Sequence, residues 1–349
     1  MLWRPTRRSP IGVEVTPGAV RLLQLEWRAG RGAVRASAEV LLPEGIEPAD
    51  DLFSPALVAG VKKALKENPF RGRQAVINLP SDQTILRHVK VESIQGHALH
   101  DALLFELEDA FPGDTPLVQH LEVGEVIERG ERRHELILLA AGLGQVNEFV
   151  RMLEQAGLEP RAIDAEGCAL IRCFTRQHRR KSDGEAHTAI VHLGETSTLM
   201  TITGDGAALF MKQLPLGAGQ LIETIQQRLD LTREDLRYAV QSEDGEEELA
   251  EQIIGALRLQ LDALSLELSA CLRYHAASRR SPGGVELVLC GTGAAIPGLA
   301  PMLSDALDMV VHRPDPFTLP FTGVESNPRL SREFGAWSVP LGLALREVG

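Results

Sequence analysis

Residues 189–229 read AIVHLGETSTLMTITGDGAALFMKQLPLGAGQLIETIQQRL, and this stretch decides the fold. A short apolar run, Ala189–Leu193, is followed by the β-branched, alternating run Thr196–Thr203. After a glycine-containing turn comes a third run, Ala207–Leu214, and Gly217 then precedes apolar residues spaced four apart. The stretch therefore predicts a three-strand meander that leads through a glycine turn into a helix.

The start of the chain repeats this plan. Ile11–Val15, Val20–Leu25 and Ala33–Leu42 are three apolar or alternating runs, and Gly45 follows them as Gly217 follows the later set. Two similar meanders, one opening each half of the chain, predict a duplicated α/β fold. The alternative is a chance resemblance between two unrelated β-meanders.

The composition is that of a soluble globular protein with two domains or lobes: 349 residues, 44% hydrophobic and 24% charged. A net charge of −12 argues against a nucleic-acid binder, whose surface would be basic. The basic N-terminus leads into no apolar run, and no run reaches the ~18 residues of a membrane span. The four cysteines form no CxxC pair. We therefore expect a cytoplasmic protein with reduced thiols.

Residues 84–160 predict a small α/β insert, because their pattern reads strand, helix, strand, strand, helix. The expected elements are Gln83–Val91, Gly96–Phe111, Leu117–Val126, Glu135–Ala141 and Gln145–Ala156. The expected first lobe comprises residues 1–83, 161–186 and 331–349. The expected second lobe comprises residues 187–330, with 218–284 as its outer, helical subdomain.

Glu247–His275 predicts a long helix in this outer subdomain, because leucine or isoleucine recurs along it every three or four residues. Core packing is the simpler interpretation of this stripe, and a dimer interface is the alternative. A shorter helix is expected over Leu231–Val240, and a terminal helix over Ser331–Arg346 with a break at Pro340.

Three glycine turns follow strands and are candidates for phosphate contacts, because their backbone N–H groups point outward and no side chain obstructs them. They are Gly194 with Thr196 and Ser197, Gly217 with Gly219, and Gly291 with Gly293. One such turn is a weak signal, but three at matching places in a duplicated fold favour a site that contacts phosphate. The sequence contains no Walker A lysine motif.

The order of these elements resembles that of the superfamily of actin, sugar kinases and heat-shock chaperone ATPases. More closely, the chain resembles the PilM family, actin-like cytoplasmic proteins of type IV pilus assembly that are similar to the division protein FtsA. The resemblance runs over nearly the whole chain and is clear in IGVEVTPGAVRLLQL, AVINLPSDQTILRHVKV, AGLEPRAIDAEGCAL and LCGTGAAIPGLAPML. It implies a duplicated actin-like fold, with two lobes around a nucleotide cleft and a small α/β insert subdomain.

The resemblance also implies a nucleotide site with ATP and Mg²⁺ as cofactors. Glu14 takes the place of an aspartate that helps to hold Mg²⁺, and Arg21 takes the place of a phosphate-side lysine. The residues carried over to nucleotide binding are Arg21, Gly194, Thr196, Gly217, Gly219, Glu223, Gly291, Thr292 and Gly293.

Several positions depart from the family pattern. His192 stands where an aspartate is usual, and a neutral imidazole is a poor ligand for Mg²⁺. Pro17 and Ala19 stand among the positions that usually carry hydroxyls. We therefore expect a degraded phosphate and metal side, where ATP binds weakly, binds without hydrolysis, or does not bind. Asp164 and Glu166 are candidates to orient an attacking water, although a helix cap explains Asp164 equally well, and no catalytic residue is assigned.

In function, the resemblance implies a cytoplasmic scaffold, peripheral at the inner membrane, that docks the N-terminal peptide of a bitopic PilN-type protein. The peptide would lie between the first lobe and the insert, with the strand Gln83–Val91 as its candidate surface. Pilus motor or platform proteins are further candidate partners, and homodimerisation stays open. Any ATPase activity is expected to be weak. The alternatives are an active Mg²⁺-dependent ATPase, an FtsA-like filament-forming division protein, and the cytoplasmic domain of a type II secretion platform protein.

Overall fold

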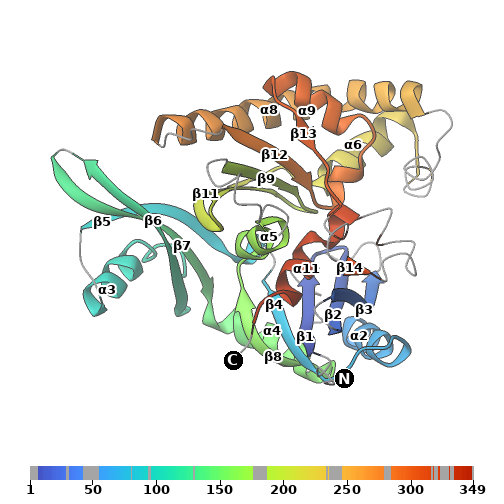
Figure 1. The fold of residues 1–349 in the computed structure, drawn as a ribbon, viewed down its shortest axis with the longest axis horizontal. Helices are drawn as coiled ribbons and strands as arrows, with labels where there is room; N and C mark the ends of the chain where they lie inside the picture. The colour runs from blue at the N-terminus through green and yellow to red at the C-terminus, as the bar shows by residue number, and fades with distance from the viewer. Residues whose placement is uncertain are drawn as a thin grey trace.

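The chain forms three β-sheets with helices between and around them (Figure 1). This architecture comes from a computed structural model. The described residues are 7–28, 31–41, 55–79, 81–92, 96–128, 130–175, 187–232, 235, 246–278, 284–315, 317, 321–322, 330 and 334–347. None of the described helices combines the length and apolar character that a membrane-crossing helix needs.

The first sheet has six strands in the order β14-β3-β2-β1-β4-β8. Their bounds are β1 Arg7–Val15, β2 Ala19–Arg28, β3 Arg31–Leu41, β4 Gln74–Asn78, β8 Glu159–Asp164 and β14 Phe321–Thr322. β1, β2 and β3 form an antiparallel meander, and β4 continues the sheet in parallel with β1. Because side chains alternate along a strand, Ile11, Val13 and Val15 all enter one core, beneath helix α2 (Pro55–Glu67).

The second sheet has the same plan in the order β11-β10-β9-β12-β13. Its strands are β9 His187–Leu193, β10 Thr198–Gly204, β11 Ala207–Leu214, β12 Val285–Cys290 and β13 Val311–His312. β9 pairs antiparallel with β10 and parallel with β12, as β1 does with β2 and β4. The predicted duplication and the predicted fold class are therefore confirmed.

Three helices cover the outer face of the second sheet: α6 Ala218–Leu229, α8 Glu246–Ser278 and α9 Leu299–Leu307. The leucine stripe of α8 lies in the core against them, as the simpler interpretation expected: Leu257, Leu261, Leu264 and Leu268 are buried there. The inner face of this sheet meets two helices shared with the first sheet, α5 Glu166–Thr175 and α11 Ser338–Ala344 (Figure 1). This shared core joins the two sheets.

The third sheet, β5-β7-β6, stands beside the other two (Figure 1). Its elements are β5 Ile85–Glu92, β6 Pro116–Glu128, β7 Glu131–Gly142 and α3 His97–Phe105. One face packs under α3, and the other face packs against α5 and β11 through residues that include Ile137, Ile171 and Met211. The insert is thus in contact with the first lobe's α5 and the second lobe's β11.

Helix α4 (Leu143–Gln155) packs differently from the expectation. Residues 84–160 were predicted to form the insert, with α4 as its last element. In the structure, Val146, Phe149 and Leu153 enter the core of the six-stranded sheet beside α2. The reason is that the next element, β8, is a strand of the six-stranded sheet. The amphipathic helix α4 therefore lies beside that sheet and covers one of its faces with its apolar side. The lobe boundaries stay a proposal, which this packing would move toward residue 142.

Three further expectations need adjustment. Helix α3 ends at Phe105 rather than at Phe111. The terminal α-helix starts at Ser338, after a 3₁₀ turn at Phe334–Trp337, and is not broken at Pro340 because its first turn needs no proline N–H. β14 pairs with β3 of the first sheet, although the expected boundary at residue 330 assigns it to the second lobe. The predicted helix Leu231–Val240 lies mostly outside the described residues.

The place of α4 in the core predicts a large loss of stability on Phe149→Ala. Phe149 is 0% exposed, so its removal leaves a cavity and should lower the free energy of unfolding by about 3–5 kcal/mol. The matched control is Phe105→Ala in α3, because Phe105 is 73% exposed and should change stability little. Urea unfolding of both variants tests this, and equal losses would contradict the packing described.

Candidate functional site

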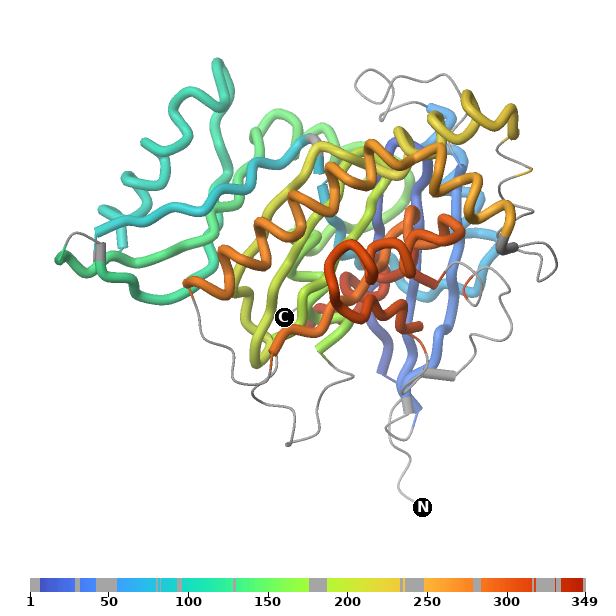
Figure 2. The backbone as a smooth tube through the Cα atoms, turned by 90° about the horizontal axis from the view of Figure 1, so that it is seen from above, coloured from blue at the N-terminus to red at the C-terminus, as the bar shows by residue number. Residues whose placement is uncertain are grey.

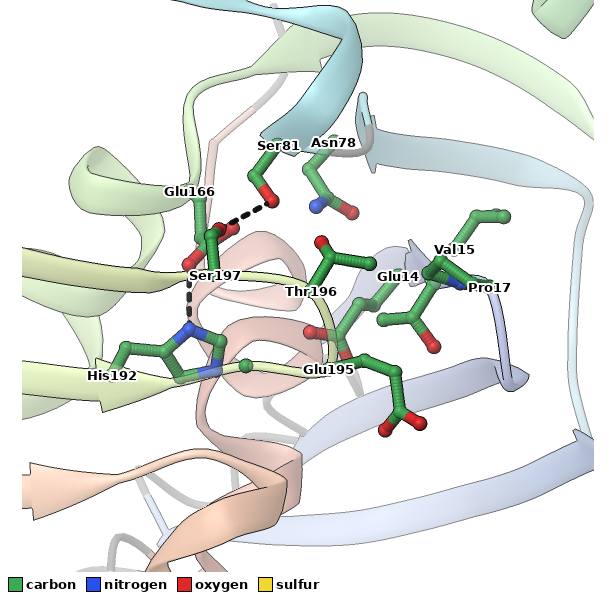
Figure 3. A pocket seen from close by; sticks show the side chains of 12 residues that line it. Glu14, Val15, Pro17, Asn78, Ser81, Glu166, His192, Glu195, Thr196 and Ser197 are labelled. Atoms are coloured by element: carbon green, nitrogen blue, oxygen red, sulfur yellow. Dashed lines mark hydrogen bonds and ion pairs between the residues drawn. The ribbon is translucent and has the colours of Figure 1, made fainter. Parts of the chain in front are cut away.

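A small pocket lies between the turns that open the two halves of the chain (Figure 3). One wall is the β1–β2 turn, the other is the β9–β10 turn, and the ends of β4 and α5 contribute the rest. Its lining residues are Glu14, Val15, Thr16, Pro17, Asn78, Ser81, Glu166, His192, Gly194, Glu195, Thr196 and Ser197. The space open to a water-sized sphere is about 20 Å³, enough for a water molecule or two.

Arg21 is held between two carboxylates in the first sheet. Arg21 is the cross-strand neighbour of Glu14 in the β1–β2 pair and of Glu39 in the β2–β3 pair. Its Nη1 lies 3.3 Å from Glu14 Oε2, and its Nε lies 3.0 Å from Glu39 Oε1. All three side chains are buried, so the guanidinium is engaged within the sheet.

These buried charges shift one another's pKa values. Burial raises the pKa of Glu14 above its usual value, and the neighbouring Arg21 offsets this only in part. Burial also works against the charge of Arg21, but Glu14 and Glu39 together outweigh it and raise the pKa of Arg21. Arg21 therefore stays charged and serves as the counter-ion of two strands.

His192 forms a second buried pair on the other side of the pocket. Its Nδ1 lies 2.5 Å from Glu166 Oε1 at the start of α5 (Figure 3). Burial disfavours the imidazolium, but the Glu166 carboxylate prevails and raises the pKa of His192. His192 is thus a core histidine with its hydrogen bond satisfied, which is one of the interpretations that the sequence left open. A neutral ring was expected from the sequence, but the raised pKa of His192 favours the protonated, cationic ring.

The β9–β10 turn is bonded to the first amides of α6. The Ala218 N–H donates to Gly194 O at 2.7 Å, and the Gly219 N–H donates to Glu195 O at 2.9 Å. This approach is so close that a Cβ on Gly217 would lie 2.2 Å from Glu195 O. The need for glycine at position 217 is therefore steric, and two of the unpaired N–H groups of the helix start are used by the chain itself.

The Glu195 side chain extends from this turn toward both glycine turns of the pocket. A Cβ built on Gly18 of the β1–β2 turn would lie 3.6 Å from Glu195 Oε1, and one on Gly219 would lie 3.5 Å from the same atom. A carboxylate of the chain thus lies between the β1–β2 turn and the start of α6.

A family model described as type IV pilus assembly protein PilM matches residues 12–348. The chain belongs to the PilM family. Its structure is similar to a solved structure of a PilM-PilN type IV pilus biogenesis complex, with a TM-score of 0.78 and 23% identity over 98% of this chain and 99% of that one. It is also similar to the ethanolamine utilization protein EutJ of Carboxydothermus hydrogenoformans, with a TM-score of 0.55 and 13% identity over 99% of this chain and 92% of that one.

The sequence-predicted site residues fall into two groups in this PilM-family chain. The first group lines the pocket and consists of Glu14, Gly194 and Thr196. Arg21 belongs with it because it forms an ion pair with Glu14, although Arg21 itself is not in the lining. The others lie outside the pocket lining: Gly217 and Gly219 behind the β9–β10 turn, Gly291, Thr292 and Gly293 at the end of β12, and Glu223 exposed on α6. Their assignment to nucleotide binding stays a prediction.

The turn after β12 is shaped by packing against β9. Gly291 has a φ of 93°, in the region that favours glycine, and a Cβ there would lie 2.4 Å from Leu193 O. Its N–H donates to Gly335 O at 3.0 Å. A Cβ on Gly293 would lie 2.4 Å from Leu193 Cδ2. Close contact with Leu193 of β9, through its backbone at Gly291 and its side chain at Gly293, therefore explains both glycines without a ligand.

The carboxylates considered for catalysis are also engaged. Asp164 pairs with Arg172 and with Arg346, and its Oδ1 accepts a hydrogen bond from the Ala165 N–H. A helix cap would bond to an amide two or three residues further on, so the helix-cap interpretation stays a prediction. Glu166 holds His192. Within the described ranges, no three or more His, Cys, Asp or Glu side chains gather where they could hold a metal ion. Glu14 as a metal ligand stays a prediction.

The sequence reasoning missed Ser81 and Glu195. Ser81 Oγ lies 2.9 Å from Ser197 Oγ, and Gln213 Nε2 donates to the Ser81 carbonyl at 3.0 Å. These bonds join the segment after β4 to the second sheet. A usable signal was present for Ser81, because it follows the carboxyl end of a parallel strand, where sites of α/β folds gather. For Glu195, its position inside a glycine turn was the only clue.

The His192–Glu166 pair predicts a pH dependence of stability. Because the pKa of His192 is raised in the folded state, the pair stabilises fully below the unfolded value of 6.5, and this contribution is lost as the pH rises through the folded-state pKa. The stability difference between the wild type and His192→Gln should therefore shrink from about pH 6 to about pH 9 in urea unfolding. His97→Gln, at the exposed start of α3, is the control. A difference that grows with pH would contradict the assignment.

Proposed function

We propose that this PilM-family chain is a cytoplasmic scaffold of type IV pilus assembly, and that it docks the N-terminal peptide of a PilN-type membrane protein. Membership of the family and the similarity in fold to a PilM-PilN complex support the partner class. Association with the inner membrane would then come through this partner.

The scaffold proposal rests on one observation: the charged groups and helix amides around the pocket are already paired with other groups of the chain. Arg21 is neutralised by Glu14 and Glu39. The first amides of α6 are bonded to the β9–β10 turn, and the Glu195 carboxylate lies between the two glycine turns. A triphosphate placed there would meet carboxylates rather than free cations, and like charges repel. This supports a degraded ATP site and argues against ATP hydrolysis.

The insert offers the surface for the peptide. β5 and β6 are the outer strands of its three-stranded sheet, and neither pairs with another strand among the described residues. An extended peptide can add to such an edge, with apolar side chains held in neighbouring pockets. β5 also reaches the second lobe, because His88 Nε2 lies 3.0 Å from Met211 O. The predicted surface on Gln83–Val91 therefore borders both lobes.

Leu117 marks the junction between the insert and the first lobe. It lies opposite Ala141 in the β6–β7 pair, and Ala141 packs in the core of the six-stranded sheet. Leu117 is nevertheless 43% exposed. An exposed large apolar side chain at such a junction is suited to anchor a partner.

We expect Leu117→Glu to weaken peptide binding by at least about tenfold, because the apolar side chain that the bound peptide would cover is replaced by a charged one. The measurement is fluorescence anisotropy with the N-terminal cytoplasmic peptide of the PilN-type protein from the same organism. Val310→Glu is the matched control, since Val310 is 68% exposed beside β13, on another lobe. Point substitutions are preferable to deletion of residues 84–160, which would remove α4 from the core.

Two results would contradict the proposal. Absence of binding by the folded wild-type protein would remove the scaffold function. Unchanged binding by a folded Leu117→Glu variant would remove the junction as the docking surface.

A further inference from the structure

Helix α8 has a second apolar stripe that faces away from the core. Leu259 and Leu266 are 72% and 69% exposed, and seven residues separate them, so both lie on one side of the helix. Gly255, Ala263 and Ala270 are exposed on the same side. Figure 2 shows the molecule from above, with α8 running across the side that faces the viewer. The inner leucines already fill the core, so the outer stripe has no role in holding the monomer together.

A charged pair flanks this stripe. Arg258 and Asp262 are exposed and four residues apart, so they lie on the same side of α8. Neither side chain makes a hydrogen bond or ion pair with the described part of the chain. By contrast, Glu267 on the other flank is already paired with Lys212 at 2.8 Å. The stripe therefore carries one positive and one negative group without partners.

We propose that α8 is a self-association surface, and that it pairs antiparallel with α8 of a second copy around a two-fold axis near Gln260. In this register, Arg258 of each copy lies opposite Asp262 of the other, which gives two equivalent ion pairs. Leu266 of each copy then lies within one residue of the level of Gly255 of the other. A Cβ on Gly255 would meet nothing within 4 Å, so there is room for an incoming leucine.

The positions of Arg258 and Asp262 favour a second copy of the chain as the partner, with its α8 running antiparallel to the first. An antiparallel arrangement brings the same flank of both helices together, so an Arg and an Asp four residues apart complement each other reciprocally. A parallel arrangement around a two-fold axis would place the Arg258 and Asp262 flanks of the two copies on opposite sides of the seam, so these ion pairs could not form. A single helix face from Gly255 to Ala270 is about 24 Å long. Such a seam is smaller than a standard stable interface, so we expect a dimer that dissociates at micromolar concentration.

Sedimentation equilibrium of the full chain tests this proposal over a concentration series that extends to about 100 µM, well above the expected dissociation constant. The 38.0 kDa chain should form a species of twice its mass as the concentration rises. Leu259→Glu should abolish this species while leaving thermal unfolding of the monomer unchanged, since Leu259 is exposed. Val310→Glu is again the control, because it adds the same charge at another exposed apolar position and should dimerise as the wild type does.

The charges give a sharper test of the register. Arg258→Asp should weaken dimerisation by at least about tenfold, since it places two pairs of carboxylates in contact. The double variant Arg258→Asp/Asp262→Arg should recover wild-type dimerisation, because both pairs are restored with opposite sign. A wild-type protein that stays monomeric, a dimer that survives Leu259→Glu, or a double variant as weak as the single one would each overturn the proposal.

Discussion

The carbonyls of the β9–β10 turn accept hydrogen bonds from the first amides of α6, and the arrangement of the cleft depends on this contact. The contact requires glycine at position 217, since any side chain there would collide with Glu195 O. It also fixes where the turn points. The Glu195 side chain consequently reaches the β1–β2 turn of the other half, and the pocket between the two turns is left with room for little more than water.

On each side of this contact, buried charges are satisfied within the chain. Arg21 links three neighbouring strands through Glu14 and Glu39, and His192 links β9 to α5 through Glu166. Removing one partner of such a pair would leave an uncompensated buried charge, which costs several kcal/mol. In the function proposed above, the side chains assigned to the nucleotide are therefore already paired within the fold, and the lobes present a fixed shape to the partner.

Much of the fold could be predicted because its signals are local. The third run of the meander, Ala207–Leu214, forms a strand with the predicted bounds. The helical spacing after Gly217 predicted the helix that is observed over Ala218–Leu229. The Glu14–Arg21 pair was also within reach, because a tight turn at residues 16–19 fixes which residues of β1 and β2 face each other. The core packing of α4, the pairing of β14 with β3 and the contact of Glu166 with His192 were not. They join segments far apart in the chain, and no local pattern encodes such neighbours.

The function proposed above depends on the protein's own groups occupying the phosphate side of the proposed cleft. Titration calorimetry of the full chain with ATP, with and without Mg²⁺, tests it most directly. We expect no metal-dependent binding at micromolar ATP, because the Glu195 carboxylate and the bonded α6 amides lie where the proposed site would hold the phosphates. Mg²⁺-dependent binding at micromolar affinity would contradict it, since Arg21 and the β9–β10 turn would then have to release their present partners.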